Sequence, residues 1–198
     1  MDGSIQNVCF DEELIKRYGG RGPRYTSYPT ALQFDDSFTA RQYEQAARLS
    51  NASGRPLSLY VHIPFCRSLC YYCACNKIVT RNADRVEKYL DHLYREIELQ
   101  ATLFDDDRAV EQLHFGGGTP TYLSNEQLCD LMTHIAGAFR LDTSDAREFS
   151  IEVDPRTVDA NSIRLLAGLG LNRLSLGIQD FAADVQAAVN RVQSAEDV

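Results

Sequence analysis

The sequence is short of positive charge and of long apolar runs. Its 20 Lys and Arg residues face 28 Asp and Glu residues, which gives a formal net charge of −8 at pH 7. Because so acidic a chain repels phosphate groups, we expect no nucleic-acid partner. No stretch approaches the ~20 apolar residues of a membrane helix, and the first residues lack the basic and apolar segments of a secretory signal. We therefore expect a cytoplasmic protein without a membrane partner.

The cysteines are not spread along the chain, as a disulfide framework would require. Four of the six fall within ten residues, and these are Cys66, Cys70, Cys73 and Cys75. In a cytosolic protein, clustered cysteines typically bind a metal or carry out redox chemistry. The isolated Cys9 and Cys129 are part of no such pattern, and we expect both to be inert.

The composition is that of a globular protein, with 44% hydrophobic and 24% charged residues, and it excludes a disordered, collagen-like or coiled-coil chain. Residues 1–56 stand apart because they are rich in Gly and Pro, and we expect an irregular N-terminal arm with one helix near 39–49. The arm includes the string Gly-Pro-Arg-Tyr-Thr-Ser-Tyr-Pro-Thr at 22–30. By composition alone this string is typical of a surface loop.

From residue 57 onward, strand patterns alternate with helix patterns. The predicted strands are 57–65, 110–115, 148–153 and 173–179, and the apolar stripes of the predicted helices run over 86–104, 128–139, 163–169 and 181–189. Four strand–helix units in a row predict an α/β fold, a partial (β/α) barrel with parallel strands. Since a further strand would follow the last helix, we expect 57–198 to be an incomplete core, continued beyond 198 by more β/α units and a C-terminal domain.

The spacing Cys66-x3-Cys70-x2-Cys73 puts three thiols on one short loop after the first predicted strand. Three thiolates can hold three corners of a cubane iron–sulfur cluster and leave one iron open to a substrate or cofactor. We favour this interpretation over three others. Structural zinc normally takes two separated Cys pairs, a dithiol redox site would leave Cys66 and Cys75 unused, and buried structural cysteines rarely cluster on a loop.

The three-cysteine motif, with the aromatic Tyr72 directly before its last cysteine, resembles the signature of radical S-adenosylmethionine (SAM) proteins. Longer strings resemble the oxygen-independent coproporphyrinogen III oxidase family, and the resemblance runs from about residue 14 to 193. These strings are Gly22–Thr30, Tyr60–Cys66, Cys73–Arg81, His114–Leu123 and Ile151–Arg156. The resemblance implies a partial barrel of the radical SAM type.

The resemblance also implies that Cys66, Cys70 and Cys73 hold a 4Fe–4S cluster, whose open iron binds the amino and carboxylate groups of SAM. The reduced cluster would pass one electron to the sulfonium, which releases methionine and a 5′-deoxyadenosyl radical. The residues implied to contact this SAM molecule are Tyr60, Tyr72, Gly117 and Glu152. Those implied to touch a second SAM molecule near the substrate are Gly118, Thr119, Gln179 and Arg191.

Local patterns support part of this set. The glycine triplet 116–118 follows a predicted strand, where a backbone without Cβ atoms can approach a ligand closely. In the strand 148–153, side-chain alternation puts Glu152 on the face opposite its apolar neighbours, which in a barrel is the lumen. We place Gln179 on the last predicted strand by the same logic.

The reaction implied by the resemblance is the oxidative decarboxylation of two propionates of coproporphyrinogen III to vinyl groups, giving protoporphyrinogen IX in haem biosynthesis. A substrate with four carboxylates needs cationic or hydrogen-bonding partners. Our candidates are Arg24, Tyr25 and Tyr28, which would make the arm a lid. Cys75 is a further candidate whose role its position does not define. We also expect an external electron donor and a monomeric protein.

Two other functions stay open. The first is a haem-binding or haem-trafficking radical SAM relative, which typically lacks both Cys75 and the 22–30 string. The second is a non-enzymatic iron–sulfur redox module, which would have no use for a glycine triplet beside Glu152 and Gln179.

Overall fold

The computed structural model describes residues 10–20, 30–196 and 198, and the chain forms two compact units, Met1–Ala40 and Arg41–Val198. In the smaller unit, helix α1 (Glu12–Tyr18) begins at Asp11, whose side chain accepts a hydrogen bond from the Leu14 N–H group, and a 3-10 turn η1 spans Ala31–Gln33. Cys9 and the candidate substrate residues Arg24, Tyr25 and Tyr28 lie outside the described residues.

The larger unit has a five-stranded sheet in which every strand pair is parallel. The strand order is β1-β4-β6-β7, with β5 paired to β4 off this path. The strands are β1 (Leu57–Ile63), β4 (Ala109–Gly117), β5 (Arg140–Leu141), β6 (Glu148–Val153) and β7 (Arg173–Leu176). The predicted parallel α/β architecture is therefore confirmed.

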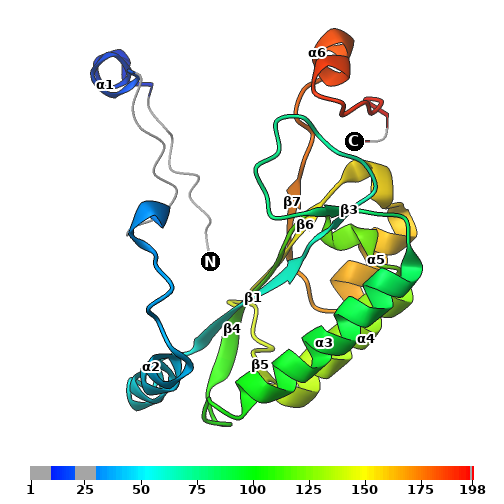
Figure 1. The fold of residues 1–198 in the computed structure, drawn as a ribbon. Helices are drawn as coiled ribbons and strands as arrows, with labels where there is room; N and C mark the ends of the chain where they lie inside the picture. Colours follow the sequence, from blue (N-terminus) through cyan, green and yellow to red (C-terminus); the bar gives the residue numbers. More distant parts are fainter. Residues whose placement is uncertain (1–9, 21–29, 197) are drawn as a thin grey trace. The chain divides into compact units, whose positions relative to one another are not determined.

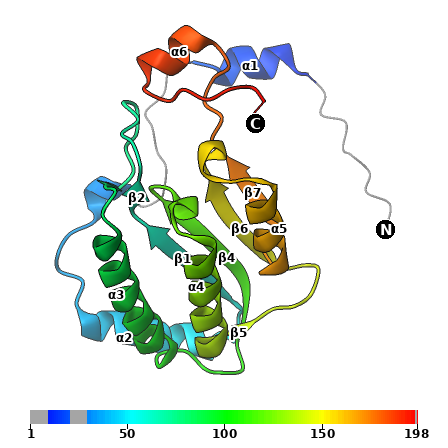
Figure 2. The ribbon, with the colours of Figure 1, turned by 90° about the vertical axis from the view of Figure 1, so that its right-hand side faces the viewer.

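Three helices connect successive strands of this order, and all three lie on the same face of the sheet (Figures 1 and 2). They are α3 (Ala83–Ala101), α4 (Asn125–Ala138) and α5 (Ala160–Gly168). Helix α4 begins with a capping box, which the spacing of Ser124 and Gln127 in the sequence predicts. Ser124 and Gln127 bond each other's backbone N–H groups. The core lies between these helices and the sheet, where Leu113, Leu131 and Ile151 are fully buried.

The remaining helices are α2 (Ala40–Ala52), which precedes β1, and α6 (Ala183–Ala188), which follows β7. Short 3-10 turns η2 (Pro120–Tyr122) and η3 (Pro155–Thr157) follow β4 and β6. Apart from its first residue, α2 falls in the larger unit. The proposed division at residue 56 stays a prediction. No helix in the described ranges is long and apolar enough to cross a membrane.

Two strand predictions need correction. The strand predicted over 57–65 breaks at Pro64, and the next residues form β2 (Phe65–Cys66), which pairs with β3 (Ile78–Val79). The strand predicted over 173–179 ends at Leu176, so Gln179 is not on it. Gln179 has φ of +71°, a left-handed conformation that cannot continue a strand. Strand alternation therefore cannot be the reason for the position of its side chain.

Candidate active site

The cysteine loop (residues 66–77) connects β2 to β3, and hydrogen bonds hold it at its base and within it. The Thr80 N–H group donates to the Cys66 carbonyl at 3.1 Å. Inside the loop, the Cys73 N–H group donates to the Cys70 carbonyl at 3.1 Å, and Lys77 Nζ donates to the Cys73 carbonyl at 2.9 Å. The short β2–β3 pair thus presents three thiols on one turn-rich segment.

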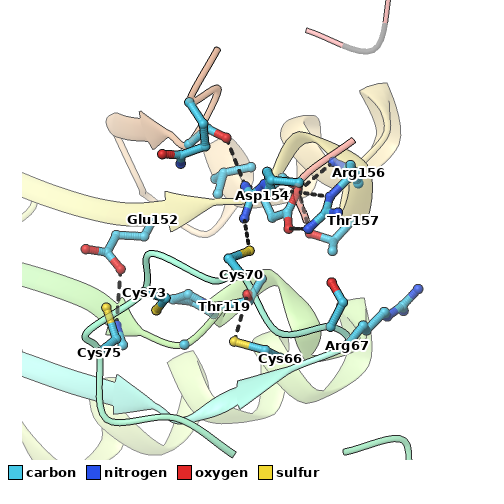
Figure 3. Close-up of a pocket in the computed structure, with 18 of the residues that line it drawn as sticks. Cys66, Arg67, Cys70, Cys73, Cys75, Thr119, Glu152, Asp154, Arg156 and Thr157 are labelled. Atoms are coloured by element: carbon cyan, nitrogen blue, oxygen red, sulfur yellow. Dashed lines mark hydrogen bonds and ion pairs between the residues drawn. The ribbon is translucent and has the colours of Figure 1, made fainter. Parts of the chain in front are cut away.

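The cysteine loop lies beside a cavity of about 500 Å³ at the carboxyl ends of β4, β6 and β7 (Figure 3). Eleven residues singled out from the sequence line it: Cys66, Cys70, Tyr72, Cys73, Cys75, Gly117, Gly118, Thr119, Glu152, Gln179 and Arg191. Because the carboxyl ends of parallel strands meet at one edge of a sheet, residues more than 120 positions apart converge here. Tyr60 lies outside this lining.

Two of the three thiols accept hydrogen bonds from the wall of the cavity. Thr119 Oγ1 donates to Cys66 Sγ at 3.5 Å, and a terminal nitrogen of Arg191 donates to Cys70 Sγ at 3.7 Å. Burial raises the pKa of the Cys66 thiol, and the Thr119 hydroxyl works in the opposite direction. Partial burial also raises the pKa of the Cys75 thiol, and its side-chain hydrogen bond with Cys73 adds to this shift.

Arg191 connects several parts of the cavity wall. One terminal nitrogen lies 3.2 Å from Asp154 Oδ1 and donates to the Gly177 carbonyl at 2.9 Å. Arg156 forms a second ion pair with the same carboxylate at 2.8 Å. Burial opposes ionisation of Asp154, but the hydrogen bond from Arg156 and the charge of Arg191 outweigh it and lower the pKa of the carboxyl group. Arg191 Nε is buried and has no partner among the described residues.

Glu152 points from β6 toward the cavity (Figure 3), and its neighbours Ile151 and Val153 are buried on the opposite face, as strand alternation predicted. The Gly117 N–H group donates to Glu152 Oε2 at 3.1 Å. His114 Nε2 lies 3.7 Å from Glu152 Oε1. One oxygen is thus bonded to the backbone, and the side chain remains 45% exposed with acceptor sites to spare.

Tyr60 belongs to an aromatic group beside Glu152. Its hydroxyl lies 2.9 Å from His62 Nδ1, and its ring stacks on that of His114 with 5.7 Å between ring centroids. Burial raises the pKa of Tyr60, and the nearby Glu152 carboxylate adds to the shift. Tyr60 therefore packs against the histidine that approaches Glu152.

The glycine triplet is required by close packing inside the chain. Gly117 has φ of +118°, which side-chain-bearing residues rarely adopt. A Cβ atom on Gly118 would lie 2.7 Å from the Pro64 carbonyl oxygen, a backbone atom that cannot move aside cheaply. These glycines let the end of β4 lie against the chain that follows β1.

Sequence reasoning gave no role to several residues that line the cavity. Among these are Asp154 and Arg156, which directly follow β6, and also Gly177, Arg67 and Arg81. The position of Asp154 and Arg156 at the carboxyl end of a parallel strand was a usable signal, since that edge of an α/β sheet is where ligands bind.

A 4Fe–4S cluster fits these residues. It requires soft thiolate ligands, and three cysteines of one loop supply them in one cavity. Within the described ranges, no three His, Cys, Asp or Glu side chains converge closely enough to hold a single metal ion. A cluster needs no such convergence, because each thiolate binds a different iron atom. The unpartnered Arg191 Nε is a buried donor available to an anionic ligand group.

Comparison with known proteins defines the class. The model of the radical SAM superfamily matches residues 60–198, which include the cysteine loop and every strand end around the cavity. The chain therefore belongs to the radical SAM superfamily. Membership implies a 4Fe–4S cluster and SAM as cofactors.

Relatives narrow this class to one family. The chain is 49% identical to the oxygen-independent coproporphyrinogen III oxidase of Pseudomonas aeruginosa, over 98% of its own length and 42% of the relative's. It is 50% identical to the Mannheimia haemolytica protein of the same name, over 76% of its own length and 100% of the relative's. Within the superfamily, the chain belongs to the oxygen-independent coproporphyrinogen III oxidase family.

A solved structure agrees with this assignment. Coproporphyrinogen III oxidase from Escherichia coli, described as a radical SAM enzyme, matches with a TM-score of 0.82 and 48% identity. The match covers 97% of this chain and 42% of that one, so the chain spans about two fifths of the length of these longer relatives. The four-strand path β1-β4-β6-β7 therefore corresponds to part of the fold of that longer structure.

Proposed function

We propose that the protein uses this cavity for the oxygen-independent oxidative decarboxylation of two propionates of coproporphyrinogen III, giving protoporphyrinogen IX. The observation that carries the proposal is the convergence of three thiols, the Glu152 carboxylate and the Arg191 guanidinium in one cavity. The names of the relatives support this substrate. Each propionate loses one hydrogen atom, one CO2 and one electron, which passes to an external acceptor, and a vinyl group remains.

In this proposal, Cys66, Cys70 and Cys73 are the ligands of the 4Fe–4S cluster. When bound and reduced, the cluster supplies the electron that splits SAM into methionine and a 5′-deoxyadenosyl radical. The free acceptor sites of Glu152 take hydrogen bonds from the ribose hydroxyls of this SAM molecule. The other proposed contacts to it are Tyr60, Tyr72 and Gly117.

We further propose that a second SAM molecule binds where Gly118, Thr119, Gln179 and Arg191 line the cavity. The unpartnered Arg191 Nε supports this, because a guanidinium donor and a carboxylate form a strong charge-assisted hydrogen bond. The Asp154 carboxylate already neutralises part of the charge of Arg191. The free Nε–H group of Arg191 therefore orients a bound carboxylate more than it attracts one from a distance.

The substrate contacts are proposed from the resemblance. Arg24, Tyr25 and Tyr28 in the arm bind propionates, and Cys75, at the cavity wall beside Cys73, helps to place the substrate. An external electron donor reduces the cluster. We expect the protein to be monomeric and cytoplasmic.

The test is anaerobic reconstitution of the full-length protein, with iron and sulfide counted per chain, followed by addition of SAM, a reductant and coproporphyrinogen III. We expect 5′-deoxyadenosine to form only when the cluster is present, together with protoporphyrinogen IX. No 5′-deoxyadenosine from a fully loaded, reduced sample would refute the proposed radical chemistry. Stable haem binding without any porphyrinogen turnover would instead favour a haem-trafficking protein.

A further inference from the structure

The peptide on each side of Cys70 is tied to a distant segment of the chain. The Tyr71 N–H group donates to the Val189 carbonyl at 3.1 Å. On the other side of Cys70, Asn190 Nδ2 donates to the Leu69 carbonyl at 2.6 Å, across 121 residues of sequence. Two hydrogen bonds from the end of α6 therefore hold the residues directly before and after one proposed cluster ligand.

Helix α6 ends in a Schellman motif, which explains the conformation of Asn190. The Asn190 N–H group donates to the Ala187 carbonyl at 3.2 Å, and the Arg191 N–H group donates to the Gln186 carbonyl at 2.9 Å. This motif needs a left-handed residue where α6 stops, and Asn190 has φ of +54° there. Glycine is the usual residue at such a position, because it adopts this conformation without strain.

Asparagine at this position adds what glycine lacks, a side-chain amide, and this amide bonds the cysteine loop. The next residue, Arg191, then reaches Cys70 Sγ at 3.7 Å from the same helix end. The backbone turn at Asn190 thus directs two consecutive side chains at Cys70, one to its flanking peptide and one to its sulfur.

We propose that Asn190 is a positioning residue for Cys70, one that holds the cysteine loop in its ligand-binding arrangement before any cofactor binds. The inference rests on the proposed function, in which Cys70 is a cluster ligand. Ordering a loop costs conformational entropy, and a bond that orders it beforehand removes that cost from cofactor binding. Asn190 also links the end of α6 with the cysteine loop.

The test uses Asn190→Gly, which preserves the left-handed helix end and removes only the amide. Asn190→Asp is the companion variant, since it keeps the shape but cannot donate to the Leu69 carbonyl. The matched control is Asn172→Ala. Asn172 likewise bridges two backbone segments, donating to the Arg147 carbonyl at 2.8 Å and accepting from the Phe149 N–H group at 2.9 Å, at the opposite end of β6.

The first measurement is the alkylation rate of Cys70 relative to Cys129 in the reduced, cluster-free full chain, mapped by mass spectrometry. Cys70 is buried in the wild type, so its labelling reports opening of the cysteine loop. Loss of one hydrogen bond should raise this ratio about threefold to tenfold in Asn190→Gly and Asn190→Asp. Asn172→Ala should leave the ratio at its wild-type value.

The second measurement is the rate of iron release to a chelator and the electron paramagnetic resonance spectrum of the reconstituted proteins. We expect faster release and an altered spectrum for Asn190→Gly and Asn190→Asp, and wild-type behaviour for Asn172→Ala. An unchanged alkylation ratio in Asn190→Gly, or an equal rise in Asn172→Ala, would overturn the proposal. A wild type that takes up no cluster would refute the proposed function, while the alkylation ratio still decides whether Asn190 positions the loop.

Discussion

Two buried arginines differ in how their nitrogens are hydrogen-bonded. One lies at the amino ends of the parallel strands, here called the amino edge of the sheet, and the other lies at their carboxyl ends, the carboxyl edge. Arg108, just before β4, is 7% exposed, and Arg191, after α6, is 8% exposed. Every nitrogen of Arg108 has a partner, and these partners are the neutral Arg55 carbonyl and the side chains of Ser50 and Asn51. The partners of Arg191 are a carboxylate, a carbonyl and a thiol, and its Nε has none among the described residues.

Under the proposed function, this difference separates a structural arginine from one placed for a ligand. The bonds of Arg108 tie the end of α2 and residue 55 to the amino edge of the sheet, and no donor nitrogen is left over. Arg191 lines the cavity at the carboxyl edge, and its Nε–H donor has no partner among the described residues. In parallel α/β folds the carboxyl edge carries function and the amino edge carries stability, and the two arginines follow that division.

The strongest test of the comparison removes the thiols at the carboxyl edge. Cys66→Ser, Cys70→Ser or Cys73→Ser should abolish cluster binding, because a hydroxyl is a poor replacement for a soft thiolate ligand. Cys9→Ser and Cys129→Ser should leave it intact, and Cys129 lies on α4 away from the cavity. The measurement is iron and sulfide per chain after anaerobic reconstitution. Loss of the cluster in Cys129→Ser would contradict the three-ligand assignment.

The second prediction exchanges the two arginines for methionine. Arg108→Met should lower the free energy of unfolding by about 2–4 kcal/mol, because it removes four partly buried hydrogen bonds, yet the folded variant should bind SAM. Arg191→Met should cost less stability, since Asp154 keeps its ion pair with Arg156, but should lose affinity for the second SAM molecule that Arg191 is proposed to bind. Urea unfolding and SAM binding are measured on both variants. Equal losses of stability in Arg108→Met and Arg191→Met, with SAM binding intact in both variants, would contradict the distinction between a structural arginine and a ligand-binding one.

The third prediction extends the comparison to the proposed substrate contacts. Arg24→Ala and Cys75→Ser should keep the cluster spectrum and SAM binding yet lose most porphyrinogen turnover. For Arg24 the cause is loss of a charge-assisted hydrogen bond worth roughly 1.5–3 kcal/mol. For both variants, a substrate displaced by about 1 Å reacts up to ~100-fold more slowly. Turnover and cluster content are measured on the same full-length samples, and wild-type turnover in Arg24→Ala would leave 22–30 a surface loop.

Periodic patterns made most of the fold predictable. The apolar stripes of α3 and α4, the Ser124 capping box and the alternation around Glu152 are local features, and each one appears where the sequence predicted it. The convergence of strand ends at the cavity followed from the parallel order. The short pair β2–β3 was missed, because two-residue strands carry no periodic signal.

The cavity wall was less predictable, because its contacts join segments that are distant in the sequence. Gln179 was placed on a strand that ends three residues earlier, since the apolar pattern continues through Ile178 although the backbone turns. The pairing of Asp154 with Arg191 and the bond from Asn190 to the Leu69 carbonyl depend on tertiary packing alone. No spacing rule in the sequence predicts them.

The smallest expected effect is on the pH dependence of stability, and it follows from the different partners of Arg108 and Arg191. The partners of Arg108 do not titrate, whereas Asp154, the partner of Arg191, does. Although burial opposes its ionisation, Arg156 and Arg191 lower the pKa of Asp154 in the folded chain below its ordinary value of 3.8. Its ionised form therefore stabilises the fold above that value, and this contribution is lost as the pH falls from 3.8 through the lower folded pKa.

Below about pH 4, we expect acidification to lower the free energy of unfolding of Asp154→Asn less than that of the wild type. The slopes of the two curves against pH should differ by at most the value for one proton taken up on unfolding. Arg108→Met should keep the wild-type slope, because the variant retains Asp154 and both of its cationic partners. The exposed Asp142 and Asp159, whose pKa values are lowered by hydrogen bonds from nearby serines, titrate alike in all three proteins and cancel in the comparison. The measurement is the urea midpoint between pH 6 and 3. Parallel curves for the wild type and Asp154→Asn would mean that the ion pairs at the carboxyl edge add no stability, and Arg191 would then serve the ligand alone.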